Sequence, residues 1–171
     1  RLIPHTEDTL KDLVILETPG HAVHHLSFIL GDRLFPGEAG GNYCVIGNEE
    51  LLRPATPPRF FLDVNLKSIE LLLTVEDRPI CFSHFGQAES SHRLLEMSRN
   101  QLLRWRDIIH GIVSGGTEDE GDLVDRCMAA LLDKDPNLMA LSRMKPDRQK
   151  RERYFLANSV MGFIGYFQNN T

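Results

Sequence analysis

The chain has 171 residues, 42% hydrophobic and 25% charged, and these values are typical of a globular domain and exclude a disordered segment. Its 19 basic and 24 acidic residues give a net charge of −5, which argues against a nucleic-acid-binding protein because such proteins present a basic face. No apolar run reaches the roughly 20 residues of a membrane span, so we expect no membrane partner. The three cysteines lack CxxC spacing, which favours reduced thiols and a cytoplasmic location.

Short strands are predicted in the first third of the chain. Residues 13–16 form a buried-type apolar run that ends at a Pro-Gly turn, and residues 24–30 are rich in strand-forming side chains. A Gly-Asp break then separates residues 33–35, which we expect to complete a hairpin. Residues 42–58 contain three prolines and Gly47, and this composition predicts mostly a surface loop.

Helical spacing dominates the rest of the chain. Apolar residues recur every three or four positions from Leu62, which predicts a helix that ends near residue 77, and residues 80–82 then form a strand. A long helix follows over residues 92–113, and Ser90 is expected to cap it.

Two more helices are expected towards the C-terminus. A capping-box spacing at Thr117 starts the first, and Asp135-Pro136 ends it. The second covers residues 152–167, is apolar on most sides, and contains Gly162 and Gly165, which allow close approach to a neighbouring segment. The basic stretch 143–153 is interrupted by acidic residues and is interpreted as a solvated helix face.

Three short motifs carry the side chains that suggest chemistry. They are Thr-Pro-Gly-His at residues 18–21, Phe-Pro-Gly-Glu at residues 35–38, and Ser-His-Phe-Gly at residues 83–86. Each motif follows a predicted strand, so His21, Glu38 and His84 should meet at one edge of the strands. Imidazole nitrogens and carboxylate oxygens are zinc ligands, and these three residues are therefore a candidate partial metal site.

In this order the motifs resemble the second half of a metallo-β-lactamase-fold hydrolase. The resemblance covers about residues 10–90, and the helix at 92–113 and the aromatic-rich tail look like those of bacterial members with helical extensions. It implies an α+β fold: residues 1–113 form the C-terminal half of an αββα sandwich, a mixed β-sheet with packed helices. Residues 117–171 would form a helical C-terminal extension packed on it.

The resemblance also implies the roles of the three residues. His21 would complete a three-histidine site for one metal, Glu38 would bridge two metals and so serve catalysis, and His84 would complete the second site. The metals would be two zinc ions, with iron or manganese as alternatives, and a bridging hydroxide would attack a small-molecule ester, thioester, lactone, β-lactam or phosphoester.

The sequence departs from the family in two ways. The bridging position usually holds Asp, whereas this chain has Glu38, whose longer side chain moves the carboxylate outward. The His-x-His-x-Asp-His run that supplies most metal ligands of the family does not occur here, and Arg1 is not an initiator Met, as expected of a fragment or a processed chain. We therefore expect partial or absent metal in this chain. His24 and His25 are additional histidines, but strand alternation points only one inward.

Two functions remain open from the sequence. The first is the C-terminal portion of a metal-dependent hydrolase that acts on a small molecule. The second is a catalytically inactive truncated module that self-associates as a homodimer or higher oligomer. It would do so through a sheet face that includes Val14, Leu16, Phe28 and Phe82, since an exposed apolar face favours association.

Overall fold

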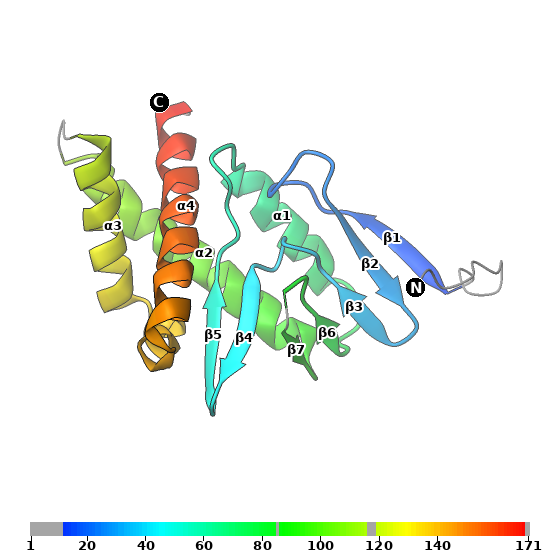
Figure 1. Ribbon diagram of the computed structural model, residues 1–171. Coiled ribbons are helices and arrows are strands. Elements are labelled where there is room, and N and C mark those ends of the chain that lie inside the picture. Colours follow the sequence, from blue (N-terminus) through cyan, green and yellow to red (C-terminus); the bar gives the residue numbers. More distant parts are fainter. Residues whose placement is uncertain (1–11, 85, 116–118, 170–171) are drawn as a thin grey trace.

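Two small sheets in the first half of the chain meet a group of helices from the second half (Figure 1). The structure is a computed structural model that describes residues 12–84, 86–115 and 119–169. The larger sheet is mixed: its strands are antiparallel neighbours except for one parallel pair, β3 with β6. Its order is β1 (Leu13–Glu17), β2 (Leu26–Leu30), β3 (Arg33–Phe35), β6 (Ile80–Cys81) and β7 (Gln87–Ala88). The predicted α+β fold class is thereby confirmed.

The smaller sheet corrects the prediction for residues 42–58. This segment forms a hairpin of β4 (Asn42–Ile46) and β5 (Glu49–Arg53), joined by a Gly-Asn turn in which Gly47 has φ +63°. All three prolines follow the hairpin, so they do not interrupt its ladder of hydrogen bonds. Tyr43, Leu51 and Leu52 are buried, and their burial fixes the hairpin against the rest of the protein.

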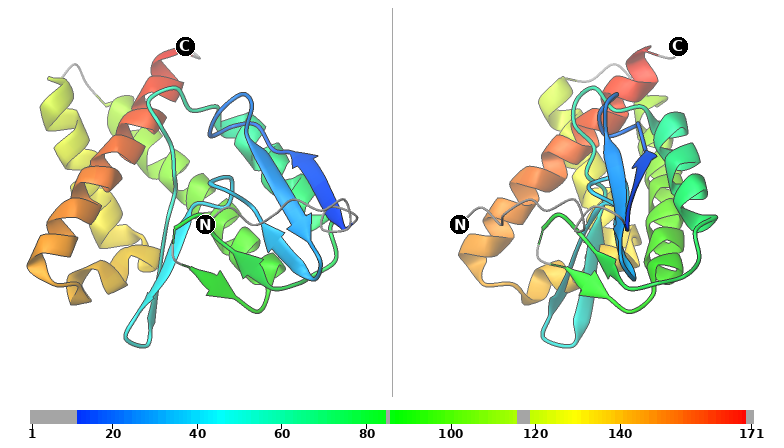
Figure 2. Two further views of the ribbon diagram at one scale, coloured as in Figure 1. Left: turned by 45° about the vertical axis from the view of Figure 1, so that its right-hand side comes forward. Right: turned by 90° about the vertical axis from the view of Figure 1, so that its right-hand side faces the viewer.

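Helices α1 (Leu62–Leu73) and α2 (Ser91–Val113) lie on one side of the larger sheet (Figure 2). The sheet residues on that side are buried, among them Ile29, Leu34 and Ile80. Both helices were expected from their spacing. Ser90 caps α2 as predicted, because its Oγ accepts a hydrogen bond from the backbone N–H of Arg93 at 3.2 Å. Strand β2 begins at Leu26, two residues later than predicted, because residues 24 and 25 belong to the preceding turn.

The opposite face of the sheet is open, but its residues differ from the predicted set. The register pairs Val14 with Ile29 and Leu16 with Ser27, which places both on the helix-covered face. Phe82 is only 7% exposed, and its ring lies 5.4 Å from that of Tyr43. Of the four predicted residues, only Phe28 belongs to the open face.

The open face follows from the same register. Ile15, Phe28 and Phe35 are aligned across β1, β2 and β3 and therefore point to one side. Leu26 and Leu30 flank Phe28 on that side. Ile15 is 56% exposed and Leu30 is 45% exposed, so we call these five residues the open apolar face.

The C-terminal helices are α3 (Glu120–Lys134), the 3₁₀ segment η2 (Pro136–Arg143) and α4 (Pro146–Asn169). The break at Asp135-Pro136 is confirmed, whereas α4 begins six residues before the predicted start at residue 152. Tyr154 and Phe155 are exposed because this early part of α4 extends past the core. The predicted capping box at Thr117 lies outside the described residues. No described helix combines the length and hydropathy that crossing a membrane requires.

One core joins α2, α4 and the segment before α1. The Trp105 ring lies 5.8 Å from Phe163 of α4, which lies 5.5 Å from Phe60. Buried Asp135 accepts hydrogen bonds from Trp105 Nε1 and Gln101 Nε2, each at 2.6 Å. The C-terminal helices thus pack on the first part of the chain, while a division into domains 1–113 and 117–171 stays a prediction.

Helix α4 approaches the loop of residues 54–58 closely, as its glycines predict. A Cβ on Gly162 would lie 2.5 Å from the carbonyl oxygen of Pro57 and 2.7 Å from that of Thr56. Two buried hydrogen bonds join the same segments: Thr56 Oγ1 donates to the Ser159 carbonyl at 2.7 Å, and Ser159 Oγ donates to the Pro54 carbonyl at 2.9 Å. Helix α4 therefore fixes the position of this loop.

We predict that Gly162→Ala lowers the free energy of unfolding by at least about 1 kcal/mol, because the new methyl group meets backbone oxygens that cannot move freely. Gly111→Ala is the matched control, since its Cβ would meet nothing within 4 Å and alanine favours a helix by about 1 kcal/mol. Urea unfolding followed by circular dichroism measures both. Equal stabilisation by the two substitutions would contradict the close packing of α4.

Candidate functional site

The turn that carries His21 is held by helix α1. Gly20 has φ +138°, and a Cβ there would lie 2.5 Å from the Cα of Asn65, so no larger residue fits. Ser68 Oγ donates a hydrogen bond to the Pro19 carbonyl at 2.6 Å. These contacts fix the turn after β1, and they place His21 at the end of the strand.

The loop that carries Glu38 is held by α1 and by His25. Asn65 Nδ2 donates to the Ala39 carbonyl at 3.2 Å. The His25 Nε2 atom accepts a hydrogen bond from the backbone N–H of Glu38 at 3.0 Å, while Nδ1 donates to the Thr18 carbonyl at 3.0 Å. This pattern requires neutral imidazole, and burial together with the nearby charge of His21 lowers the pKa of His25. His25 thus links the first two motifs.

His84 comes from the turn between β6 and β7. The backbone N–H of Gly86 donates to the His84 carbonyl at 2.8 Å, and this bond closes the turn. The His84 side chain is 57% exposed, so it is the most accessible of the three candidate ligands.

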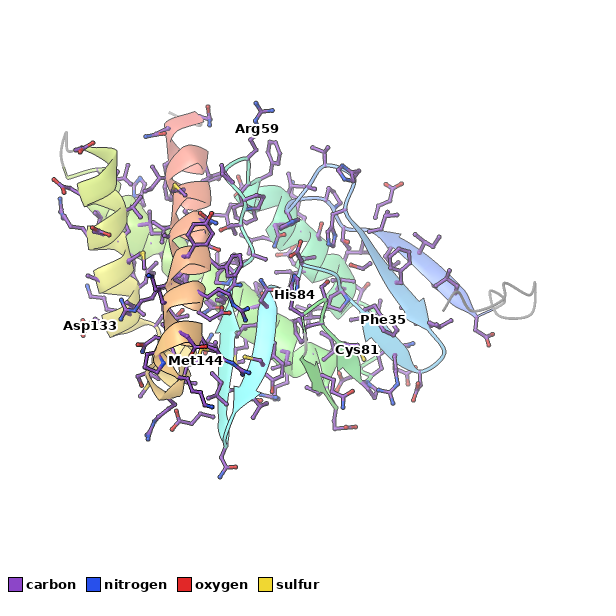
Figure 3. All side chains as sticks on the ribbon, in the orientation of Figure 1. Phe35, Arg59, Cys81, His84, Asp133 and Met144 are labelled. Atoms are coloured by element: carbon purple, nitrogen blue, oxygen red, sulfur yellow. The ribbon has the colours of Figure 1, made fainter. Side chains whose placement is uncertain are left out.

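The three candidate ligands lie together at one edge of the strands, and Figure 3 labels His84 there. His21 Nε2 lies 2.7 Å from Oε2 of Glu38, and His84 Nε2 lies 3.2 Å from Oε1 of the same carboxylate. On its other side, His21 Nδ1 donates to the Ala55 carbonyl at 2.7 Å. The carboxylate of Glu38 therefore has a different histidine at each oxygen.

Both nitrogens of His21 face oxygen atoms that accept hydrogen bonds, so the ring is stabilised as an imidazolium. The hydrogen bond to Glu38 raises the pKa of His21 above its usual value of 6.5, against the opposing effect of burial. The same hydrogen bond, helped by His84, lowers the pKa of Glu38 to about 2. A cation bound at Nε2 of His21 would therefore compete with the hydrogen bond to Glu38.

The imidazole and carboxylate groups at the site are suitable metal ligands, but they are few. The Ala55 carbonyl fixes Nδ1 of His21 as a donor, which leaves Nε2 as the ligand atom, as outer hydrogen bonds do at zinc sites. With one oxygen of Glu38 and one histidine, each metal of a pair would have two ligands, whereas zinc takes four. Across the described ranges, no three His, Cys, Asp or Glu side chains are arranged to hold a metal together. The role of His21, Glu38 and His84 as ligands stays a prediction.

These residues are part of the lining of a large groove of about 1210 Å³. The β4–β5 hairpin, the loop at 55–57 and helix α4 supply most of the remaining lining. In the view of Figure 3, His84 and Met144, which both line the groove, lie on either side of the hairpin. The groove is open enough to admit a small molecule to the three side chains.

Sequence reasoning placed the three motif residues but missed their supports. His25 lies in a turn, so strand alternation did not predict its contact with the backbone of Glu38. His24 is exposed, so of these two histidines only His25 points inward. No sequence signal marks the Ala55 carbonyl, because a backbone acceptor depends only on the path of the loop. The groove was also missed, because it joins residues about 100 positions apart.

No protein-family model matches the chain. It is similar to the metallo-β-lactamase fold-containing protein ST1585 of Sulfurisphaera tokodaii, with 28% identity over 106 residues, which are 62% of this chain and 38% of that protein. Its fold is similar to the crystal structure of the metallo-β-lactamase family protein TTHA1429 from Thermus thermophilus. That comparison gives a TM-score of 0.56 at 19% identity and covers 92% of this chain and 44% of the other.

The chain spans less than half the length of either protein. The matching sequence and the matching fold point to the same superfamily as the three motifs. They confirm the predicted resemblance, and the chain carries part of the metallo-β-lactamase fold.

Proposed function

We propose that the chain contributes the His21, Glu38 and His84 ligands to the metal site of a hydrolase that acts on a small molecule in the cytoplasm. The observation that carries the proposal is the Glu38 carboxylate, which has one histidine at each oxygen, at 2.7 and 3.2 Å. This arrangement suits a carboxylate that bridges two cations, each of which also has one imidazole ligand. The remaining ligands would be water or groups from outside the described residues.

The residues around the site prepare it for a metal. The Ala55 carbonyl orients His21, and His25 holds the backbone of Glu38, so two of the three ligands are fixed in advance. When bound, zinc lowers the pKa of water and thereby supplies a hydroxide nucleophile near neutral pH. His84, the most exposed of the three residues, would be the third ligand. Ester, thioester or lactone substrates would enter along the groove.

Isothermal titration calorimetry with zinc at pH 7 tests whether His21, Glu38 and His84 bind the metal. We expect weak binding, and a loss of affinity of about tenfold or more in His84→Ala, because each metal has few ligands here. His24→Ala is the matched control, since His24 is exposed and does not contact Glu38. Unchanged zinc binding by a His21→Ala/His84→Ala variant would refute the proposed site.

A second candidate function is self-association without catalysis, and the open apolar face favours it. Ile15, Leu26 and Leu30 are 56%, 38% and 45% exposed, respectively, on adjacent strands. Covering such a surface gains about 25 cal/mol per Å² of apolar area. A second copy of the chain would supply a matching face, which gives a homodimer or a higher oligomer.

Size-exclusion chromatography with light scattering tests this second candidate. At micromolar concentration we expect a homodimer or higher oligomer, and we expect Ile15→Glu/Leu30→Glu to be monomeric because charges on the face cannot be buried cheaply. Glu70→Lys on the exposed side of α1 serves as a charge-changing control that keeps the oligomer. A wild-type chain that stays monomeric would exclude self-association.

A further inference from the structure

The groove has a basic wall although the protein is acidic overall. The net charge of the chain is −5, yet five cationic side chains line the groove: Arg53, Arg143, Lys145, Arg148 and Arg151. Among the described residues, two carboxylates line it with them, Glu38 and Glu152. The charge of the groove is therefore opposite to that of the whole protein.

Ion pairs neutralise only part of this wall. Arg53 lies 3.0 Å from Glu152, and both side chains are largely buried, while Arg143 lies 3.2 Å from Glu49. None of the ion pairs among described residues involves Lys145, Arg148 or Arg151, and all three are exposed. Asp147 and Glu152 lie one helical turn from Arg151 and Arg148, respectively, but neither forms a close ion pair with them, so all three cationic groups can still bind an anion.

The geometry of α4 explains why these charges gather there. Arg148, Arg151 and Phe155 follow a spacing of three and four residues and so share one face of the helix. Lys145 directly precedes the helix and extends the same wall. The N-terminus of a helix carries a partial positive charge, which has the same sign as these three side chains.

Apolar surface lies beside the basic wall. Phe155 is 39% exposed and Val45 of the hairpin is 56% exposed, and Met144 and Ile46 also line the groove. A ligand that fits both surfaces has a carbon body and an anionic group. Low-dielectric walls with charges of one sign concentrate the field on such a ligand.

We propose that the groove binds a substrate with an apolar body and a carboxylate or phosphate group, and that Lys145, Arg148 and Arg151 hold the anionic group. Guanidinium groups bind both anions through paired hydrogen bonds, and a lysine adds a point charge. The inference rests on the proposed function, since the bond to be cleaved would lie near His21, Glu38 and His84, which line the same groove. It adds a substrate class that the metal ligands do not determine.

Binding of three small probes to the metal-free chain tests the inference by ¹H–¹⁵N NMR. The probes are 4-phenylbutyrate, phenyl phosphate and the neutral 4-phenylbutyramide. We expect the anions to shift amide signals of the groove at lower concentration than the amide does, and the tighter anion identifies the preferred group. Raising the NaCl concentration from about 20 to about 200 mM should weaken the binding of both anions and leave the binding of the amide unchanged.

Two charge-matched variants complete the test. Arg148→Glu/Arg151→Glu should weaken anion binding by about fivefold to 30-fold, a loss of one or two good ionic contacts. Lys67→Glu/Lys134→Glu changes the net charge equally on exposed surfaces away from the groove and should keep the wild-type affinity. Equal affinity of the groove variant and the wild type, or equal binding of the amide and the anions, would overturn the inference.

The result separates this inference from the proposed function. The probes are measured with the metal-free chain, so a failure of zinc to bind His21 and His84 leaves the anion measurement intact. If zinc binds as proposed and the anions do not, only the inference about the substrate fails.

Discussion

The carboxylate of Glu38, held between two imidazoles, is the contact on which the rest of the site depends. It joins a turn after β1, a loop after β3 and a turn after β6, which are separated by up to 63 positions in the chain (from His21 to His84). The hydrogen bond between Glu38 and His21 lowers the pKa of Glu38 to about 2 and raises the pKa of His21 above its usual value. Removing one partner of a half-buried pair is costly, because it leaves the other group unpaired. The pair therefore links the loops that carry His21 and Glu38.

The helices position this pair from behind. Helix α1 binds the carbonyls of Pro19 and Ala39, one on each side of the site, through Ser68 and Asn65. Helix α4 reaches it indirectly, because Ser159 binds the Pro54 carbonyl and the next residue, Ala55, accepts the hydrogen bond of His21. The C-terminal helix is thus coupled to the candidate site and also forms the basic wall of the groove. A packing change at α4 should reach His21 through this loop.

The three motifs could be located from the sequence because each lies at a strand end, and strand ends on a common edge bring their side chains together. Helices α1 and α2 were equally visible from their apolar spacing. The β4–β5 hairpin was missed because the count of prolines in residues 42–58 concealed that all of them follow the ladder. Of the residues predicted for the open face, only Phe28 was correct, since Val14 and Ile15 are both apolar and only the register decides which one faces the helices. The groove depends on how η2 and α4 lie beside the hairpin in the folded chain, which local sequence patterns do not predict.

The titration of His21 in the metal-free chain measures the central contact most directly. Side-chain ¹H–¹⁵N correlation spectra across pH give the pKa of each histidine in the wild type and in Glu38→Gln. A His21 pKa above 6.5 in the wild type, with a clear decrease in the variant, is the result that the account predicts, since the amide removes the charge that stabilises the imidazolium. The same His21 pKa in both proteins would mean that Glu38 does not hold this ring, and the site described above would not exist.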